Sequence, residues 1–157
     1  MSVDELYANA LSFFEKKEFF ANADDTMKTE NYLKKVLTVE KERLVKFSDV
    51  GEENKFFFQS IICEKEMLRW KKITDEEIRK SLETSMGTLE KIADDDWTRE
   101  FLEAKLLEAA GDKRGDILWP LRVALTGAQK SPSPFEVAWV LGKTEALQRI
   151  SQALKLV

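Results

Sequence analysis

Apolar residues recur every three or four positions through most of this 157-residue chain, which is the spacing that places them on one face of an α-helix. The spacing predicts a helix over residues 3–20 and a second over residues 30–47. In the second helix the buried stripe is expected to hold Leu33, Val36, Leu37, Leu44 and Phe47. No alternation of apolar and polar residues is sustained as in a strand. The pattern therefore predicts an all-α fold, a helical bundle.

Capping motifs predict where several later helices begin. Thr74-Asp-Glu-Glu77 and Ser133-Pro-Phe-Glu136 both have the S/T-x-x-E spacing in which a hydroxyl and a carboxylate cap the first turn. Pro120 is tolerated in a first turn and Gly127 suits a left-handed helix end, so a short helix is expected over 120–126. The triplet Asp94-Asp95-Asp96 is interpreted as acids at a helix N-terminus, one of which caps the helix, rather than as a metal site.

Three consecutive aromatic residues, Phe56, Phe57 and Phe58, point about 100° apart if they lie on a helix. They then cannot all face one core, and at least one must be buried by a second layer. We therefore expect a domain boundary near residue 60, with a first helical subdomain over 1–60 and a second over 61–157.

Composition excludes several classes of protein. No stretch approaches the roughly 18 apolar residues of a membrane span, and acids follow Met1 where a secretion signal carries positive charge, so the cytoplasm is expected. The chain has no histidine and one cysteine, Cys63, which removes the commonest general base and the internal disulfide. We expect no catalysis, metal or cofactor in this chain. Catalysis by paired carboxylates has no supporting cluster of residues, because such pairs are usually solvent-exposed ion pairs.

Charge is unevenly distributed along the sequence. Residues 1–113 carry 19 basic and 26 acidic side chains, a net charge of −7, whereas residues 114–157 carry 6 and 3, a net charge of +3. A basic end is compatible with nucleic-acid binding, although a difference this small also arises on ordinary solvated surfaces.

Several motifs resemble the C-terminus of bacterial glutamyl-tRNA synthetase. They are the run Pro120-Leu-Arg-Val-Ala-Leu-Thr-Gly127, then Ser131-Pro132, then Leu141-Gly-Lys-Thr-Glu-Ala-Leu-Gln-Arg-Ile150. Upstream, Glu42 and Arg43 followed by the aromatic triplet are similar to a further signature of that family, as are Trp97 and Thr98. The resemblance covers nearly the whole chain.

The resemblance implies an α-helical cage of two subdomains that holds the anticodon loop of glutamate tRNA. In that family a separate domain performs the ligation with ATP and magnesium, through HIGH and KMSKS motifs that this sequence lacks. The implied chain is therefore a non-catalytic, tRNA-binding monomer with no DNA or membrane partner.

The resemblance also assigns candidate RNA contacts. Arg43 matches the arginine that inspects the third anticodon base in discriminating members of the family, where a glutamine relaxes discrimination against glutamine tRNA. Arg122 matches the arginine of the PLR run near the anticodon, and Ser131, Pro132 and Pro134 fall on the segment that contacts anticodon bases. Arginine planes and apolar walls suit single-stranded bases.

Other interpretations of these residues stay open. Arg43 could cover the core from the margin of its helix, and Arg122 could pair with an acid such as Asp116. Trp119 and Trp139 are more often core residues than base-stacking ones. A different function is a helical protein-interaction or regulatory module derived from the cage, with exposed aromatics near Phe56 to Phe58 as its docking patch.

Overall fold

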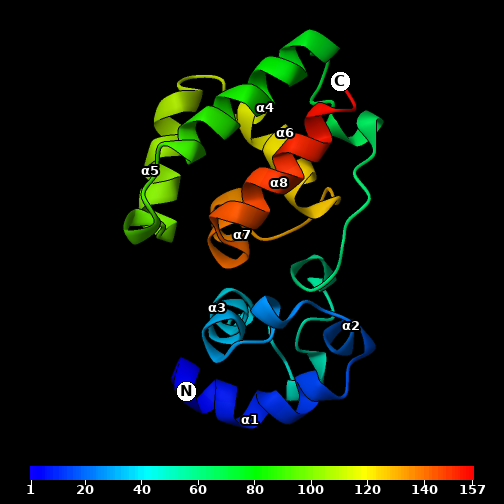
Figure 1. Ribbon diagram of the computed structural model, residues 1–157, viewed down its shortest axis with the longest axis vertical. Coiled ribbons are helices and arrows are strands. Elements are labelled where there is room, and N and C mark those ends of the chain that lie inside the picture. Colours follow the sequence, from blue (N-terminus) through cyan, green and yellow to red (C-terminus); the bar gives the residue numbers. More distant parts are fainter. The chain divides into compact units, whose positions relative to one another are not determined.

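The computed structural model describes residues 1–157 and is all-helical, with eight α-helices, short 3-10 turns and no strand (Figure 1). The all-α fold expected from the periodicity is confirmed. The chain divides into two compact units, Met1–Ser60 and Ile61–Val157. Each unit has its own core and is described separately. That each unit is an anticodon-binding subdomain stays a prediction.

Unit 1 is built from α1 (Val3–Glu15), α2 (Glu18–Ala21) and α3 (Glu30–Glu40). The hydroxyls of Ser2 and Thr29 accept backbone N–H groups to cap α1 and α3. Helices α1 and α3 pack against each other. Their facing stripes are buried, and comprise Leu6, Ala10, Phe14, Leu33, Val36 and Leu37.

Both N-terminal helices are shorter than the periodicity predicts. Helix α1 ends at Glu15, and Lys17 is extended before the single turn of α2 begins. Helix α3 ends at Glu40, so the predicted continuation to Phe47 is wrong. The buried Glu40 side chain accepts hydrogen bonds from residues 51 and 54, which therefore lie beside this helix end. The chain must turn at residues 41–43 to bring them there.

The aromatic triplet does not lie on the α-helix on which its predicted geometry depends. Phe56, Phe57 and Phe58 are 7%, 0% and 1% exposed. They lie at a 3-10 turn, Lys55–Phe57, and not on an α-helix, so the separation of 100° does not apply. The Phe58 ring lies 5.4 to 6.2 Å from four aromatic rings of unit 1, those of Phe14, Phe19, Phe20 and Tyr32. All three rings are buried, and the triplet is not a docking patch of exposed aromatics.

Unit 2 contains α4 (Asp75–Glu90), α5 (Arg99–Ala110), α6 (Arg114–Thr126), α7 (Pro134–Leu141) and α8 (Lys143–Leu154). Helix α4 runs against both α6 and α8, and α5 packs against α4 and α7 (Figure 1). The core holds leucines and isoleucines from these helices, among them Ile78, Leu82, Leu89, Leu102, Leu106, Leu121 and Ile150. No helix is long and apolar enough to cross a membrane.

Two of the predicted helix caps are confirmed and one is wrong. Thr74 and Ser133 cap α4 and α7 as expected, each hydroxyl accepting from the backbone N–H of the glutamate three residues later. For α5 the expected aspartate cap is wrong. Asp94, Asp95 and Asp96 form a separate 3-10 turn, and the hydroxyl of Thr98 accepts from Phe101 N–H to cap the helix.

Pro120 lies inside α6 rather than at the start of a helix, so the predicted start at residue 120 is wrong. A proline has no N–H, and the carbonyl four residues earlier loses its helical donor. That carbonyl belongs to Asp116, and the Ser81 hydroxyl of α4 donates to it at 2.8 Å. A neighbouring helix therefore supplies the donor that lets α6 continue through its proline.

Replacing Ser81 with alanine should test this compensation. The substitution leaves the Asp116 carbonyl without a donor, and we expect the free energy of unfolding of unit 2 to fall by about 1–3 kcal/mol. Urea denaturation followed by tryptophan fluorescence measures this, because Trp70, Trp97, Trp119 and Trp139 all lie in unit 2.

Ser85→Ala is the matched control, one turn along the same helix. Ser85 is also buried, and its hydroxyl has no hydrogen-bond partner, so its removal should be neutral or slightly stabilising. Equal losses for the two variants would contradict a specific role for Ser81.

Candidate nucleic-acid interface

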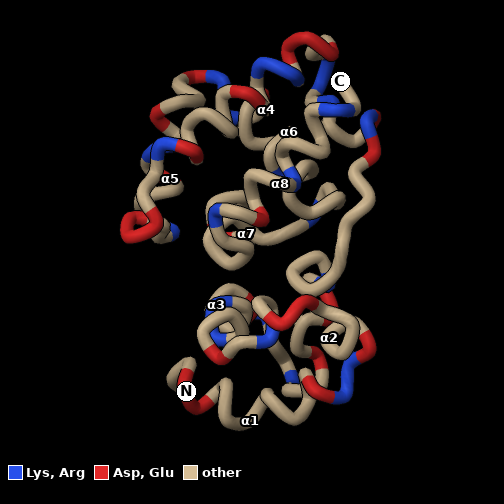
Figure 2. The backbone as a smooth tube through the Cα atoms, viewed as in Figure 1, with Lys and Arg blue, Asp and Glu red and all other residues tan.

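Arg43 lies on a turn at residues 41–43, directly after α3, and its side chain is exposed. Its backbone N–H donates to the Glu40 carbonyl at 2.9 Å. The expectation that Arg43 sits at the margin of a helical apolar stripe is therefore wrong, because the helix ends three residues earlier. Exposure leaves its guanidinium available to a ligand. Lys41 and Lys46 are exposed on the same segment, and Figure 2 shows the basic residues around α3.

The segment after α3 is held at its far end by the Glu40 side chain, which is 5% exposed. Glu40 Oε1 accepts the Gly51 N–H at 3.0 Å and Oε2 accepts from Asn54 Nδ2 at 2.7 Å. Burial raises the pKa of this carboxyl above its usual value, while the hydrogen bonds from Gly51 and Asn54 oppose that shift. The carboxylate is thus a buried polar anchor within an otherwise apolar unit.

Arg122 is half-buried on α6, and its Nη1 donates to the Ser131 carbonyl at 3.1 Å. Its partner is this carbonyl and not Asp116, so the ion pair considered from the sequence is wrong. The structure therefore brings Arg122 and Ser131 together at one corner of unit 2. The Arg122 guanidinium is partly committed to holding the loop between α6 and α7.

The same corner contains the remaining candidates. Ser131 and Pro132 are half-buried, and the Ser131 hydroxyl donates to the Pro132 carbonyl at 2.7 Å. Pro134 is buried at the first turn of α7. Of these three positions Pro134 has the least surface to offer a ligand, and its contribution is mainly to start α7.

Gly127 ends α6 in the left-handed conformation, with φ 68°, as the sequence predicts. A Cβ at this position would lie 2.8 Å from the Ile62 carbonyl oxygen. Only glycine therefore fits between this helix end and the backbone of Ile62. The close approach fixes where the loop containing Ser131 begins.

Arg149 is a structural residue that the periodicity does not single out. It is 3% exposed on α8, its Nη1 donates to the Leu125 carbonyl at 2.7 Å, and its Nε lies 2.9 Å from Glu145 Oε1. It thereby joins α8 to the last turn of α6. The only local signal is the i,i+4 spacing of Glu145 and Arg149, which does not reveal burial.

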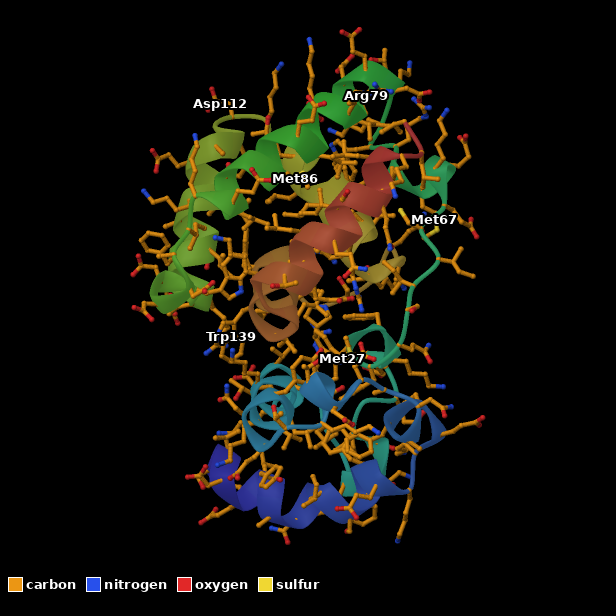
Figure 3. The ribbon with its side chains drawn as sticks, in the orientation of Figure 1. Met27, Met67, Arg79, Met86, Asp112 and Trp139 are labelled. Carbon is orange, nitrogen blue, oxygen red and sulfur yellow. The ribbon has the colours of Figure 1, made fainter.

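The two tryptophans considered as core residues are both half-buried. Trp119 Nε1 donates to the Met67 carbonyl at 2.9 Å, and its ring centroid lies 5.2 Å from that of Trp70. Trp139 projects from α7 (Figure 3), with the Arg99 guanidinium 4.7 Å from its ring centroid. Both rings are therefore engaged by neighbouring elements of unit 2.

An all-helical chain with an exposed arginine on one turn and an arginine-bound loop at one corner is compatible with a domain that contacts RNA. The family comparison defines it further. Residues 5–154 match the profile described as "Anticodon binding domain". The chain belongs to this family of anticodon-binding domains.

Curated proteins similar to this chain include glutamate–tRNA ligases. The enzyme of Clostridium acetobutylicum is 33% identical over 156 residues, which cover 96% of this chain and 30% of that protein. The enzyme of Thermus thermophilus is 29% identical, covering 88% of this chain and 29% of the relative. The chain thus spans less than a third of the length of these relatives. The suspected family resemblance is confirmed.

Solved structures share the fold. A glutamate tRNA ligase from Elizabethkingia meningosepticum, crystallised in complex with its amino acid, matches with a TM-score of 0.77 and 20% identity, covering 99% of this chain and 29% of that one. The glutamate-tRNA synthetase of Elizabethkingia anophelis matches with a TM-score of 0.72. The all-helical architecture is therefore that of a known domain type.

Arg122→Met should loosen the corner of unit 2. The variant keeps an apolar side chain of similar length but loses the donor to Ser131, so we expect amide hydrogen exchange in residues 127–133 to become faster, by about 1 kcal/mol of local opening free energy. Arg114→Met, on an exposed position of the same helix, is the control and should leave the loop unchanged. Unaltered exchange in Arg122→Met would contradict the anchoring role.

Proposed function

We propose that this chain binds the anticodon loop of glutamate tRNA and is the non-catalytic, anticodon-binding part of a glutamate–tRNA ligase acting in the cytoplasm. The observation that carries the proposal is the family membership over residues 5–154 together with relatives that are glutamate–tRNA ligases. In the proposed parent, ATP, magnesium and ligation belong to the catalytic part. This chain then works without a cofactor and as a monomer.

The geometry supports two different roles for the basic residues. The exposed guanidinium of Arg43 can stack on an unpaired base and donate hydrogen bonds to its edge. Arg122 is half-buried and bound to the Ser131 carbonyl, so we assign it to shaping the loop of Ser131, Pro132 and Pro134 against the RNA. Base discrimination is therefore assigned first to Arg43.

The aromatic docking patch of a protein-interaction module lacks the exposed surface it requires. All three members of the triplet are buried. The chain's net charge of −4 disfavours indiscriminate attraction to phosphates, so affinity must come from local contacts. Local contacts with unstacked bases are what an exposed arginine supplies.

Arg43→Gln should selectively weaken discrimination. The test compares binding to the anticodon stem-loop of glutamate tRNA with binding to the same stem-loop carrying guanine in place of cytosine at the third anticodon base. We expect the free-energy difference between the two RNAs to shrink by about 1–3 kcal/mol, since the fork of donors is lost. Fluorescence anisotropy at one stated salt concentration measures both dissociation constants.

Lys46→Gln is the control, because it removes one exposed positive charge from the same segment. It should weaken both RNAs about equally and reduce the salt dependence of binding. If the protein binds neither stem-loop, or if Arg43→Gln leaves the preference intact, the proposed role of Arg43 is wrong.

A further inference from the structure

We infer that Glu40 is a positioning residue for RNA recognition, which sets the place of Arg43 by fastening both ends of the segment that carries it. This inference rests on the proposed function, since it assigns Glu40 a role through Arg43. Glu40 is not a candidate contact itself, because its side chain is buried in unit 1. It is distinct from the residues that the family resemblance assigns to RNA.

The backbone of Glu40 holds the near end of the segment. Glu40 is the last residue of α3, where a backbone carbonyl needs a donor from the residues that follow the helix. This carbonyl accepts the N–H of Arg43 at 2.9 Å and that of Leu44 at 3.0 Å. The turn that presents Arg43 is therefore closed by direct hydrogen bonds to Glu40.

The side chain of the same residue holds the far end. Its two oxygens accept from Gly51 N–H and from Asn54 Nδ2, eleven and fourteen residues further along the chain. Backbone and side chain therefore close a loop around Arg43 from a single position. The near closure uses only the backbone, so the far closure is the one that depends on the side chain at residue 40.

The far end is itself tied into the aromatic core, which makes the anchor rigid. Gly51 has φ 73°, and a Cβ there would lie 2.9 Å from the Phe19 ring. The Phe19 ring stacks on Phe58 at 5.4 Å between centroids and 8° between planes. Asn54 is 8% exposed. The far end of the loop around Arg43 is thus packed against the aromatic cluster of unit 1.

A carboxylate suits this position because two separate donors converge on it. A carboxylate has two acceptor oxygens, whereas a glutamine amide has one oxygen and presents its NH₂ group to the second donor. Burying a charge is costly, and the nearby acids Glu52 and Glu53 add to that cost. Glutamine could also satisfy both partners, because the Asn54 amide can turn to present its oxygen to the glutamine NH₂ group. The position therefore requires a side chain of this length that ends in two polar atoms.

Glu40→Met tests the inference in a double-mutant cycle with Arg43→Gln. Methionine has a similar length but lacks both carboxylate oxygens. The measured quantity is the ratio of dissociation constants for the two stem-loops that differ at the third anticodon base. We expect Glu40→Met to reduce this ratio by roughly 2- to 10-fold, the range for residues coupled in one network. In the Arg43→Gln background it should have no further effect. An unchanged ratio in Glu40→Met, or an equal reduction in both backgrounds, would overturn the inference.

Two further variants separate positioning from charge and from unfolding. Glu53→Gln removes one negative charge from an exposed position of the same segment and should leave the ratio unchanged. Glu40→Gln is the conservative variant, because its oxygen can accept from Gly51 and its NH₂ group can donate to a turned Asn54 amide. This variant should keep the ratio, and a loss as large as that of Glu40→Met in a folded protein counts against the inference.

Amide exchange distinguishes failure of this inference from failure of the proposed function. In Glu40→Met the amide of Gly51 loses its acceptor and should exchange faster by NMR, with or without RNA. The amides of Arg43 and Leu44 keep the backbone carbonyl of residue 40, so their exchange should rise only because the segment loosens. If Arg43→Gln does not affect RNA preference, the proposed role of Arg43 fails, and these amides alone decide whether Glu40 holds the turn. Unchanged exchange at all three amides shows that Glu40 does not position the segment.

Discussion

The requirement that buried backbone groups find hydrogen-bond partners governs this structure at the points where its helices end or are interrupted. The carbonyl of Asp116, deprived of its donor by Pro120, receives the Ser81 hydroxyl. The carbonyl of Leu125, near the end of α6, receives the buried guanidinium of Arg149. Lys143 donates to the carbonyls of Glu90 and Ile92 at the end of α4. Side chains from distant elements thus hold the helices at fixed lengths and positions.

This requirement also explains which features the sequence predicts. Caps made within one turn were predictable, because Thr74 and Ser133 each lie three residues from the glutamate whose N–H they accept. Helix limits that depend on remote partners were not. The apolar spacing after Glu40 continues as in a helix, but the partners that turn the chain back, Gly51 and Asn54, are more than ten residues away. Neighbouring residues determine that a helix forms, whereas the point at which α3 ends depends on residues distant in the sequence.

The candidate site shows the same division. The motifs that resemble the synthetase family correctly indicate the class of domain, and the run from Pro120 to Gly127 with Ser131 does form one corner. The sequence could not place Arg43, because its position follows from the end of α3. It also could not reveal that Arg122 is bound to a carbonyl or that Pro134 is buried. The exposure and the hydrogen-bond partners of an arginine depend on the tertiary structure, which the spacing of residues along the sequence does not determine.

The two arginines consequently differ in what they can contribute to recognition. A guanidinium that already donates to a protein carbonyl, as Arg122 does, has fewer free donors and less freedom to adapt, which suits shape and loop order. An exposed guanidinium on a turn keeps all its donors, but it would lose conformational entropy on binding unless the turn is ordered beforehand. The closures made by Glu40 on both sides of Arg43 limit the motion of its backbone. In the proposed function, pre-ordering the backbone while leaving the side chain free lets a short exposed turn discriminate between bases at the third anticodon position.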